Sequence, residues 1–277
     1  MQLPLEDNYE DVLGKAMRGR GLTPEQLAGK AGITVEQTRA VLGGAFEAET
    51  ARRLARELEL GPERVVALGE KTYHPDPVSV EPGVLQFNTP FDDMTVNAYL
   101  VWDPATRDAA VFDTGTDVSD LLEAARAREL KIVAIYLTHA HGDHIYDLDR
   151  LMEKTKVPAF APVAEPVDGA MPFEPGTEFE IGGIKVRTRL TWGHARGGVT
   201  YMIDGLEKPV AICGDAMFAG SMGGGMISYA DALRTNREEI LSLPGETVLC
   251  PGHGPMTTVT EQKKANPFFP ERKQGGV

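Results

Sequence analysis

Three histidines and an aspartate lie within six residues of the chain, directly after an apolar run. His139, His141, Asp143 and His144 follow residues 132–137, which are mostly aliphatic and are typical of a buried strand. Neutral imidazoles and carboxylates are the ligands that zinc and similar divalent metals prefer. The spacing therefore predicts that a strand delivers these four side chains from its C-terminal end to a metal site.

Three more side chains of the same kind follow later segments that resemble strand ends. His194 and His253 lie in glycine-containing turns, and Asp215 follows the apolar residues 210–213 and one glycine. Of the six histidines, only His74 lies outside this pattern. One isolated histidine would more often cap a loop or satisfy a core polar group, but the four strand ends together favour a single metal centre.

The order of these residues, with Phe112-Asp113-Thr114-Gly115 upstream, resembles the metallo-β-lactamase superfamily across roughly residues 84 to 270. Residues 214–221, 243–248 and 251–258 are similar to the compact glyoxalase II-like (hydroxyacylglutathione hydrolase-like) enzymes. The resemblance implies an α/β fold, a four-layer αββα sandwich of two sheets with helices outside. The alternation of apolar runs with helical patterns in this part of the chain also favours helices flanking stacked sheets.

The same resemblance implies two divalent metal ions, with zinc expected and iron or manganese as alternatives. The ligands implied for one metal are His139, His141 and His194. Those implied for the other are Asp143, His144 and His253, with Asp215 bridging the two metals. Two such ions share a water that ionises near neutral pH, and the resulting hydroxide would attack a thioester or ester carbonyl.

Four polar residues, two within this ligand set and two close to it in the sequence or by resemblance, are candidates for further roles. Asp143 and Asp215 are the catalytic candidates among the carboxylates. Asp113 is expected beside the ligands, where a carboxylate fixes the orientation of a ligating histidine, and the alternative is a turn residue at a strand end. Arg196, next to His194, is a candidate for holding a substrate carboxylate or phosphate, and the alternative is a solvated loop arginine.

The substrate stays open at this point. After His194 the chain reads Ala195-Arg196-Gly197-Gly198, which departs from the glyoxalase II-like pattern and puts a glutathione thioester in doubt. A small-molecule thioester or ester hydrolase is the first interpretation. An iron-dependent persulfide dioxygenase, a lactonase and a ligand-sensing DNA-binding regulator are the alternatives.

The first seventy residues predict a small all-helical domain of a different kind. Residues 27–44 resemble the helix-turn-helix of phage-repressor-type regulators, in which Gln37 and Arg39 would face the DNA bases. Residues 1–73 contain ten Lys and Arg against twelve Asp and Glu, so their attraction for phosphate is weak. We therefore expect a packing or homodimerisation role, and DNA binding is the disfavoured alternative.

These patterns divide the chain into three parts. The predicted boundaries are a helical domain at 1–70, a proline-rich linker at 71–83 and a hydrolase domain at 84–277. Within the first part, Thr23 and Thr34 are expected to cap two helices. A hydrolase fragment that begins near Val78, within the linker, is then expected to fold alone and to bind metal.

Composition favours a cytoplasmic protein. The formal net charge is −13, and no window approaches the ~20 apolar residues of a membrane span. The first ten residues carry Glu6, Asp7 and Glu10 rather than a basic and apolar leader. Cys213 and Cys250 fall in apolar runs, where reduced, buried thiols are expected.

Overall fold

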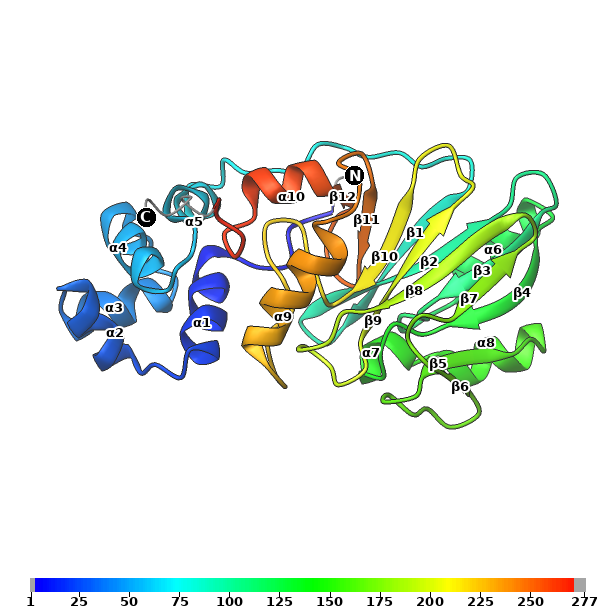
Figure 1. The fold of residues 1–277 in the computed structure, drawn as a ribbon, viewed down its shortest axis with the longest axis horizontal. Helices are drawn as coiled ribbons and strands as arrows, with labels where there is room; N and C mark the ends of the chain where they lie inside the picture. The colour runs from blue at the N-terminus through cyan, green and yellow to red at the C-terminus, as the bar shows by residue number, and fades with distance from the viewer. Residues whose placement is uncertain (1–2, 272–277) are drawn as a thin grey trace.

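The computed structural model describes residues 3–271, which form a helical part and a sandwich of two sheets (Figure 1). Thr23 and Thr34 each accept a hydrogen bond from a glutamine N–H three residues on, and each glutamine side chain accepts one from the threonine N–H. These reciprocal bonds confirm the two predicted helix starts. The helical part contains α1 (Tyr9–Gly19), α2 (Pro24–Ala31), α3 (Val35–Leu42), α4 (Ala48–Glu57) and α5 (Pro62–Gly69).

Two six-stranded sheets follow. The first sheet, in spatial order, contains β1 (Val84–Phe91), β2 (Met94–Trp102), β3 (Asp108–Phe112), β4 (Lys131–Tyr136), β5 (Ala159–Pro162) and β6 (Met171–Phe173). The second contains β7 (Glu178–Ile181), β8 (Ile184–Leu190), β9 (Val199–Asp204), β10 (Val210–Gly214), β11 (Val248–Pro251) and β12 (Thr257–Thr258). Strands β3, β4 and β5 run parallel, as do β10 and β11. Their carboxyl ends therefore lie at a common edge of each sheet.

Helices cover the outer faces of both sheets. Phe112 and Tyr201 meet edge to face at 5.1 Å in the apolar cluster between the sheets, and Leu121 and Leu151 belong to a second cluster on the outer side of the first sheet. The layers confirm the predicted αββα sandwich preceded by an all-helical segment. The remaining helices are α6 (Ser119–Ala127), α7 (Gly142–Ile145), α8 (Leu148–Thr155), α9 (Tyr229–Thr235), the π-helix η1 (Asn236–Ile240) and α10 (Val259–Ala265).

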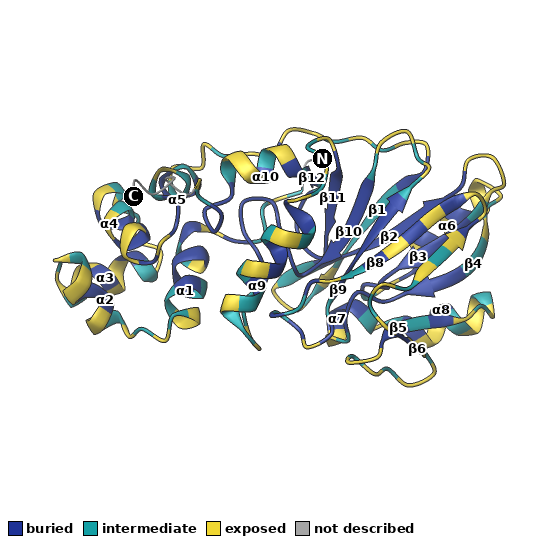
Figure 2. Cartoon of the chain, in the orientation of Figure 1, coloured by how far each residue is buried: buried dark blue, intermediate teal, exposed yellow. Residues whose placement is uncertain are grey.

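The N-terminal helices pack against the second sheet and its helices. One apolar cluster joins Leu13 and Leu54 of the helical part to Met217 and Leu249 of the sandwich. Figure 1 shows α1 beside α9, and buried segments continue across this junction in Figure 2. Arg64 of α5 also donates hydrogen bonds to three backbone carbonyls near the end of the described chain. The two parts therefore share one core. No helix among residues 3–271 is long and apolar enough to cross a membrane.

Candidate metal centre

Four strand ends meet at one edge of the sandwich and bring the predicted ligand residues together. The loop after β4 carries four of them, and the loops after β8, β10 and β11 carry one each. The side chains fall into two groups. Within each group, the ligand atoms all lie within 4.8 Å of one another. The first group is His139, His141, His194 and Asp215, and the second is Asp143, His144 and His253.

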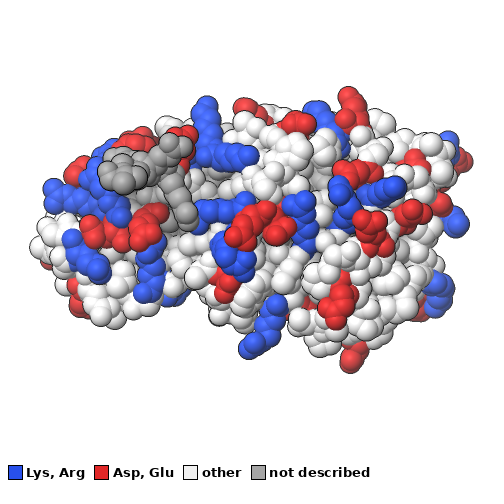
Figure 3. Space-filling view, in the orientation of Figure 1, with Lys and Arg blue, Asp and Glu red and all other residues white. Residues whose placement is uncertain are grey.

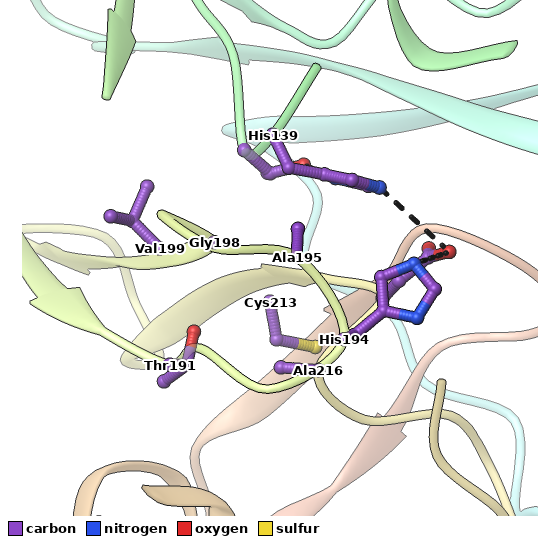
Figure 4. A pocket seen from close by; sticks show the side chains of 10 residues that line it. His139, Thr191, His194, Ala195, Gly198, Val199, Cys213 and Ala216 are labelled. Carbon is purple, nitrogen blue, oxygen red and sulfur yellow. Dashed lines mark hydrogen bonds and ion pairs between the residues drawn. The ribbon is translucent and has the colours of Figure 1, made fainter. Parts of the chain in front are cut away.

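Three imidazoles of the first group point at a common position. His141 Nδ1 lies 3.1 Å from His139 Nε2 and 3.0 Å from His194 Nε2. Asp215 Oδ2 lies 3.9 Å from His139 Nε2 and 3.3 Å from His194 Nε2. Figure 4 shows His139 and His194 reaching this position from their separate loops, with Cys213 and Ala216 below them. The convergence of three ring nitrogens on one carboxylate oxygen is a typical cation site.

The second group uses the other oxygen of the same aspartate. Asp215 Oδ1 lies 3.2 Å from His144 Nε2 and 3.4 Å from His253 Nε2. Asp143 Oδ2 lies 3.6 Å from His144 Nε2 and 3.3 Å from His253 Nε2. One carboxylate thus faces both groups, with one oxygen toward each.

Asp113 holds two of the imidazoles in place. Its buried carboxylate lies 2.9 Å from His144 Nδ1 and accepts hydrogen bonds from the Thr138 N–H and hydroxyl at 2.8 and 2.7 Å. The Thr138 hydroxyl in turn lies 3.0 Å from His139 Nδ1. In the neutral rings that a metal requires, these contacts place the proton on each Nδ1 and leave each Nε2 as an acceptor facing the centre.

Backbone carbonyls orient two more rings in the same way. His194 Nδ1 lies 2.9 Å from the Gly224 carbonyl oxygen, and His253 Nδ1 lies 2.6 Å from that of Thr95. A carbonyl can only accept, so each Nδ1 donates and each Nε2 is free to bind a cation. Gly252 is required beside these rings, because a Cβ there would overlap Asp215 Oδ1 and lie 2.6 Å from His144 Cε1.

The charges at the centre depend strongly on burial. Burial and the neighbouring imidazoles lower the pKa of His139 and His141 below the ordinary value. Burial also opposes the charge of His144 and His253, but Asp215 and the other nearby carboxylates outweigh it and raise their pKa values to about 10 and about 11. Without a metal, the site therefore balances its carboxylates with protons on two imidazoles.

Two buried polar atoms indicate that the site without a metal is incomplete. Among the described residues, His144 Nε2 and Asp215 Oδ1 have no hydrogen-bond partner, although they lie 3.2 Å apart. An unsatisfied buried polar atom costs about 1–3 kcal/mol. A divalent cation between imidazole and carboxylate would satisfy both atoms, so the donor set fits a metal in each group.

Two positioning residues were missed from the sequence. Glu165 accepts hydrogen bonds from the Ala140 N–H at 3.3 Å and the Gly197 N–H at 2.9 Å, so it ties together two ligand-bearing loops. The buried Asn97 side chain donates to the carbonyls of Pro251 and Gly254, both at 2.9 Å, and so supports the turn that carries His253. Neither residue lies in a motif that could have drawn attention to it.

A cavity of about 530 Å³ opens beside the two groups. Its inner wall contains His194, Asp215 and His253, and its opposite wall is formed by α1, including Lys15 and Arg18. A volume of this size is typical of small-molecule sites. The N-terminal helices thus contribute directly to the space in which a substrate of this centre would bind.

Three other predicted residues lie outside this cavity. Arg196 is exposed and is not part of the cavity wall as far as residues 3–271 define it. Arg39 is held by Glu25 at 2.5 Å, and the Gln37 side chain accepts the Thr34 N–H at 3.0 Å. The roles proposed for Arg196 in substrate binding and for Gln37 and Arg39 in DNA binding stay predictions.

Comparisons with known proteins show which family the sandwich part of the chain is similar to. The sequence profile described as "Metallo-beta-lactamase superfamily" matches residues 91–253. "Probable metallo-hydrolase YqgX" of Bacillus subtilis (strain 168) is 30% identical over 208 residues, which cover 65% of this chain and 95% of that protein. "Hydroxyacylglutathione hydrolase" of Halorhodospira halophila (strain DSM 244 / SL1) is 31% identical over 127 residues, which cover 45% of this chain and 48% of that protein.

A solved structure supports the same placement. The crystal structure of TTHA1623 in a di-iron-bound form superposes with a TM-score of 0.54 at 26% identity. The superposition covers 66% of this chain and 99% of that one. The uncovered third of this chain is comparable in size to the N-terminal helices and the segment that follows them.

Proposed function

Because the chain belongs to the metallo-beta-lactamase superfamily, we propose that it is a metal-dependent hydrolase that cleaves a thioester or ester at the Asp215 centre. The observation that carries the proposal is the placement of Asp215 between two ligand groups that face one cavity. Similarity to a probable metallo-hydrolase over most of that protein's length supports the reaction class. Partial similarity to a hydroxyacylglutathione hydrolase supports a thioester as the bond that is cleaved.

The seven ligand residues would hold two divalent ions, with zinc proposed and iron the main alternative. Ions held there would supply Lewis-acid chemistry, activating water and polarising the carbonyl of the substrate. The chain's own contribution is to fix the donors: Asp113, Gly224 and Thr95 orient the rings. Four of the five imidazoles are oriented by such contacts, and all five belong to the two ligand groups, so none of them is left to act as a separate general base.

The N-terminal helices are proposed to serve the hydrolase rather than DNA. Their acidic side chains neutralise the arginines that phosphates would need: Glu25 pairs with Arg39, and Glu63 pairs with Arg52. Lys, Arg, Asp and Glu are interspersed over the face shown in Figure 3, without a continuous basic stripe. Non-specific DNA affinity depends on such phosphate contacts.

The test is a substrate panel on protein purified without added metal and then loaded with zinc or iron. Thioesters, simple esters, acyl lactones and glutathione persulfide with oxygen would be assayed in parallel, with Asp215→Ala and the exposed-site control Asp168→Ala. We expect thiol release from thioesters that Asp215→Ala abolishes and Asp168→Ala retains. Oxygen consumption on persulfide, or lactone opening without thiol release, would replace the proposed function with one of the alternatives.

A further inference from the structure

We propose that α1 supplies an anion site for the substrate, so that the preferred thioester or ester carries a carboxylate that binds Arg18. The inference rests on the proposed function, since it names the substrate class of the same cavity. It assigns the N-terminal helices a role in specificity. The residues that carry it are Arg18 and its neighbours on the cavity wall.

Lys15 and Arg18 lie one helical turn apart, so their side chains share a face of α1, and both line the cavity. Lys15 is already committed. Its Nζ lies 2.5 Å from Asp7 Oδ2, donates to the Met222 carbonyl at 3.0 Å and stands over the Phe218 ring at 5.1 Å. Lys15 therefore fastens α1 to the sandwich and is not free to bind a ligand.

Arg18 lacks such a commitment. Within residues 3–271 its guanidinium has no hydrogen-bond or ion-pair partner, and it lies over Gly14, where an added Cβ would come 3.0 Å from Nη1. Five other arginines of the helical part are held by carboxylates or carbonyls, and Arg56, which is exposed, does not line the cavity. These paired arginines are Arg20, Arg39, Arg52, Arg53 and Arg64.

The charged residues that line the cavity favour a substrate with a single negative charge at this position. Glu6 also lines the cavity, but it lies at the metal end, 3.9 Å from His253 Nδ1. Arg18 lines the same cavity next to Gly19, which packs against the Tyr229 ring. One unpaired guanidinium matches one carboxylate in a planar, two-bond geometry. A phosphate, with nearly twice the charge, would need a second free cation, and Lys15, the other Lys or Arg among the described residues of the lining, is already paired with Asp7.

The overall charge makes this local cation significant. The formal net charge is −13, so an anionic substrate gains nothing from the general field of the protein. Binding must then depend on a specific partner at the cavity. The carboxylate could belong to the acyl half or to the leaving thiol half of the substrate, and the experiment separates these two sources.

The experiment uses the full-length, metal-loaded protein and uncleavable thioether probes. Calorimetry would compare S-(3-carboxypropyl)-N-acetylcysteamine with S-butyl-N-acetylcysteamine, which differ by the carboxylate on the acyl side. S-butyl-3-mercaptopropionate would place the carboxylate on the thiol side. We expect one of the two anionic probes to bind about tenfold more tightly than the neutral one, as a charge-assisted pair predicts.

Variants assign that preference to α1. Arg18→Ala should remove the preference and leave the affinity of the neutral probe unchanged, and Arg18→Lys should retain part of it. Arg39→Ala, which changes an exposed arginine of the same domain away from the cavity, should have no effect. In the assay, Arg18→Ala should raise KM for the matching anionic thioester and spare kcat.

The binding and cleavage measurements test the anion site and the hydrolase activity separately. Equal binding of all probes, no measurable binding, or a preference that survives Arg18→Ala overturns the anion site even if neutral thioesters are cleaved. An Arg18-dependent preference in protein that cleaves no thioester or ester supports the anion site and contradicts the hydrolase.

Discussion

Asp113 accepts three hydrogen bonds within the buried ring of contacts around the centre, from Thr138 twice and from His144 Nδ1. Asp113→Asn should keep the size of the side chain but offer an N–H where His144 needs an acceptor. We expect metal affinity to fall roughly 10- to 100-fold, the usual cost of losing such a contact. Competition with a chromophoric chelator measures it. Asp117→Asn, at an exposed carboxylate nearby, is the control, and equal loss in both variants contradicts the assignment.

The histidines of the metal-free site predict an unusual dependence of stability on pH. His139 and His141 have lowered pKa values, and His144 and His253 have values raised to about 10 and about 11. The ordinary pKa of histidine is 6.5. Below that pH, the unfolded chain binds protons at His139 and His141 that the folded chain does not bind, so the free energy of unfolding falls with falling pH. Between pH 6.5 and 10 the folded chain keeps protons on the second pair that the unfolded chain releases, so stability falls with rising pH.

The free energy of unfolding in EDTA should therefore be highest near pH 6.5. Urea unfolding at intervals from pH 5 to 9.5 measures it. His253→Gln should flatten the alkaline side, since it removes one of the two retained protons. Metal loading should also reduce the alkaline loss, because ligating imidazoles are deprotonated. A metal-free protein whose stability still rises from pH 6.5 to 9.5 contradicts these proton positions.

Much of the site was predictable because each ligand-type residue directly follows an apolar run. The seven residues that the sequence placed in two sets around Asp215 are the seven that the structure groups. Glu165, Asn97 and Arg18 could not be found in this way. Their contacts depend on which loops and helices meet across the fold, and a local pattern carries no information on that.

The junction between α1 and α9 depends on the absence of a side chain at Gly19. The Tyr229 ring lies so close to Gly19 that a Cβ would overlap it, whereas nothing lies within 4 Å of the corresponding position of Gly29 in α2. Gly19→Ala should destabilise the protein by about 1–3 kcal/mol through overpacking. Gly29→Ala should be neutral or stabilise by about 0.5–1 kcal/mol. Denaturant unfolding would compare the free energies of unfolding of the two variants. Similar effects of both substitutions would show that Tyr229 can move to accommodate the added methyl group.

The main helices and central strands were predictable, but several edge strands were not. Buried strands such as β4 and β10 can be predicted from their runs of aliphatic side chains. β1 is only partly buried and includes Pro90, and β6, with three residues, is too short to show a period. These strands form because neighbouring strands hydrogen-bond them, which is a property of the sheet rather than of their own residues.

The helical part and the sandwich share a core. The sequence favours a hydrolase part that folds alone, but the apolar cluster that joins Leu13 and Leu54 to Met217 and Leu249 leads us to expect the opposite. A fragment starting at Val78 would expose the sandwich side of that cluster. We expect it to aggregate or to lose cooperative unfolding.

Thermal melts and gel filtration of the fragment test this expectation. Supplying residues 1–77 as a separate chain during expression should restore a soluble, cooperative protein if the shared core is the cause. A soluble fragment with a sharp melt and normal metal binding would show that the sandwich is independent, as the sequence pattern favours.

We propose that Asp215 serves two metal ions in one chain, and the metal content per chain is the measurement that decides it. Protein saturated with zinc or iron and then desalted would be analysed by inductively coupled plasma mass spectrometry, with the fold checked by circular dichroism. We expect close to two ions per chain for the unmodified protein and for Asp168→Ala, and fewer than one for folded Asp215→Ala. A chain that retains no transition metal, or an Asp215→Ala variant that retains both ions, would contradict it.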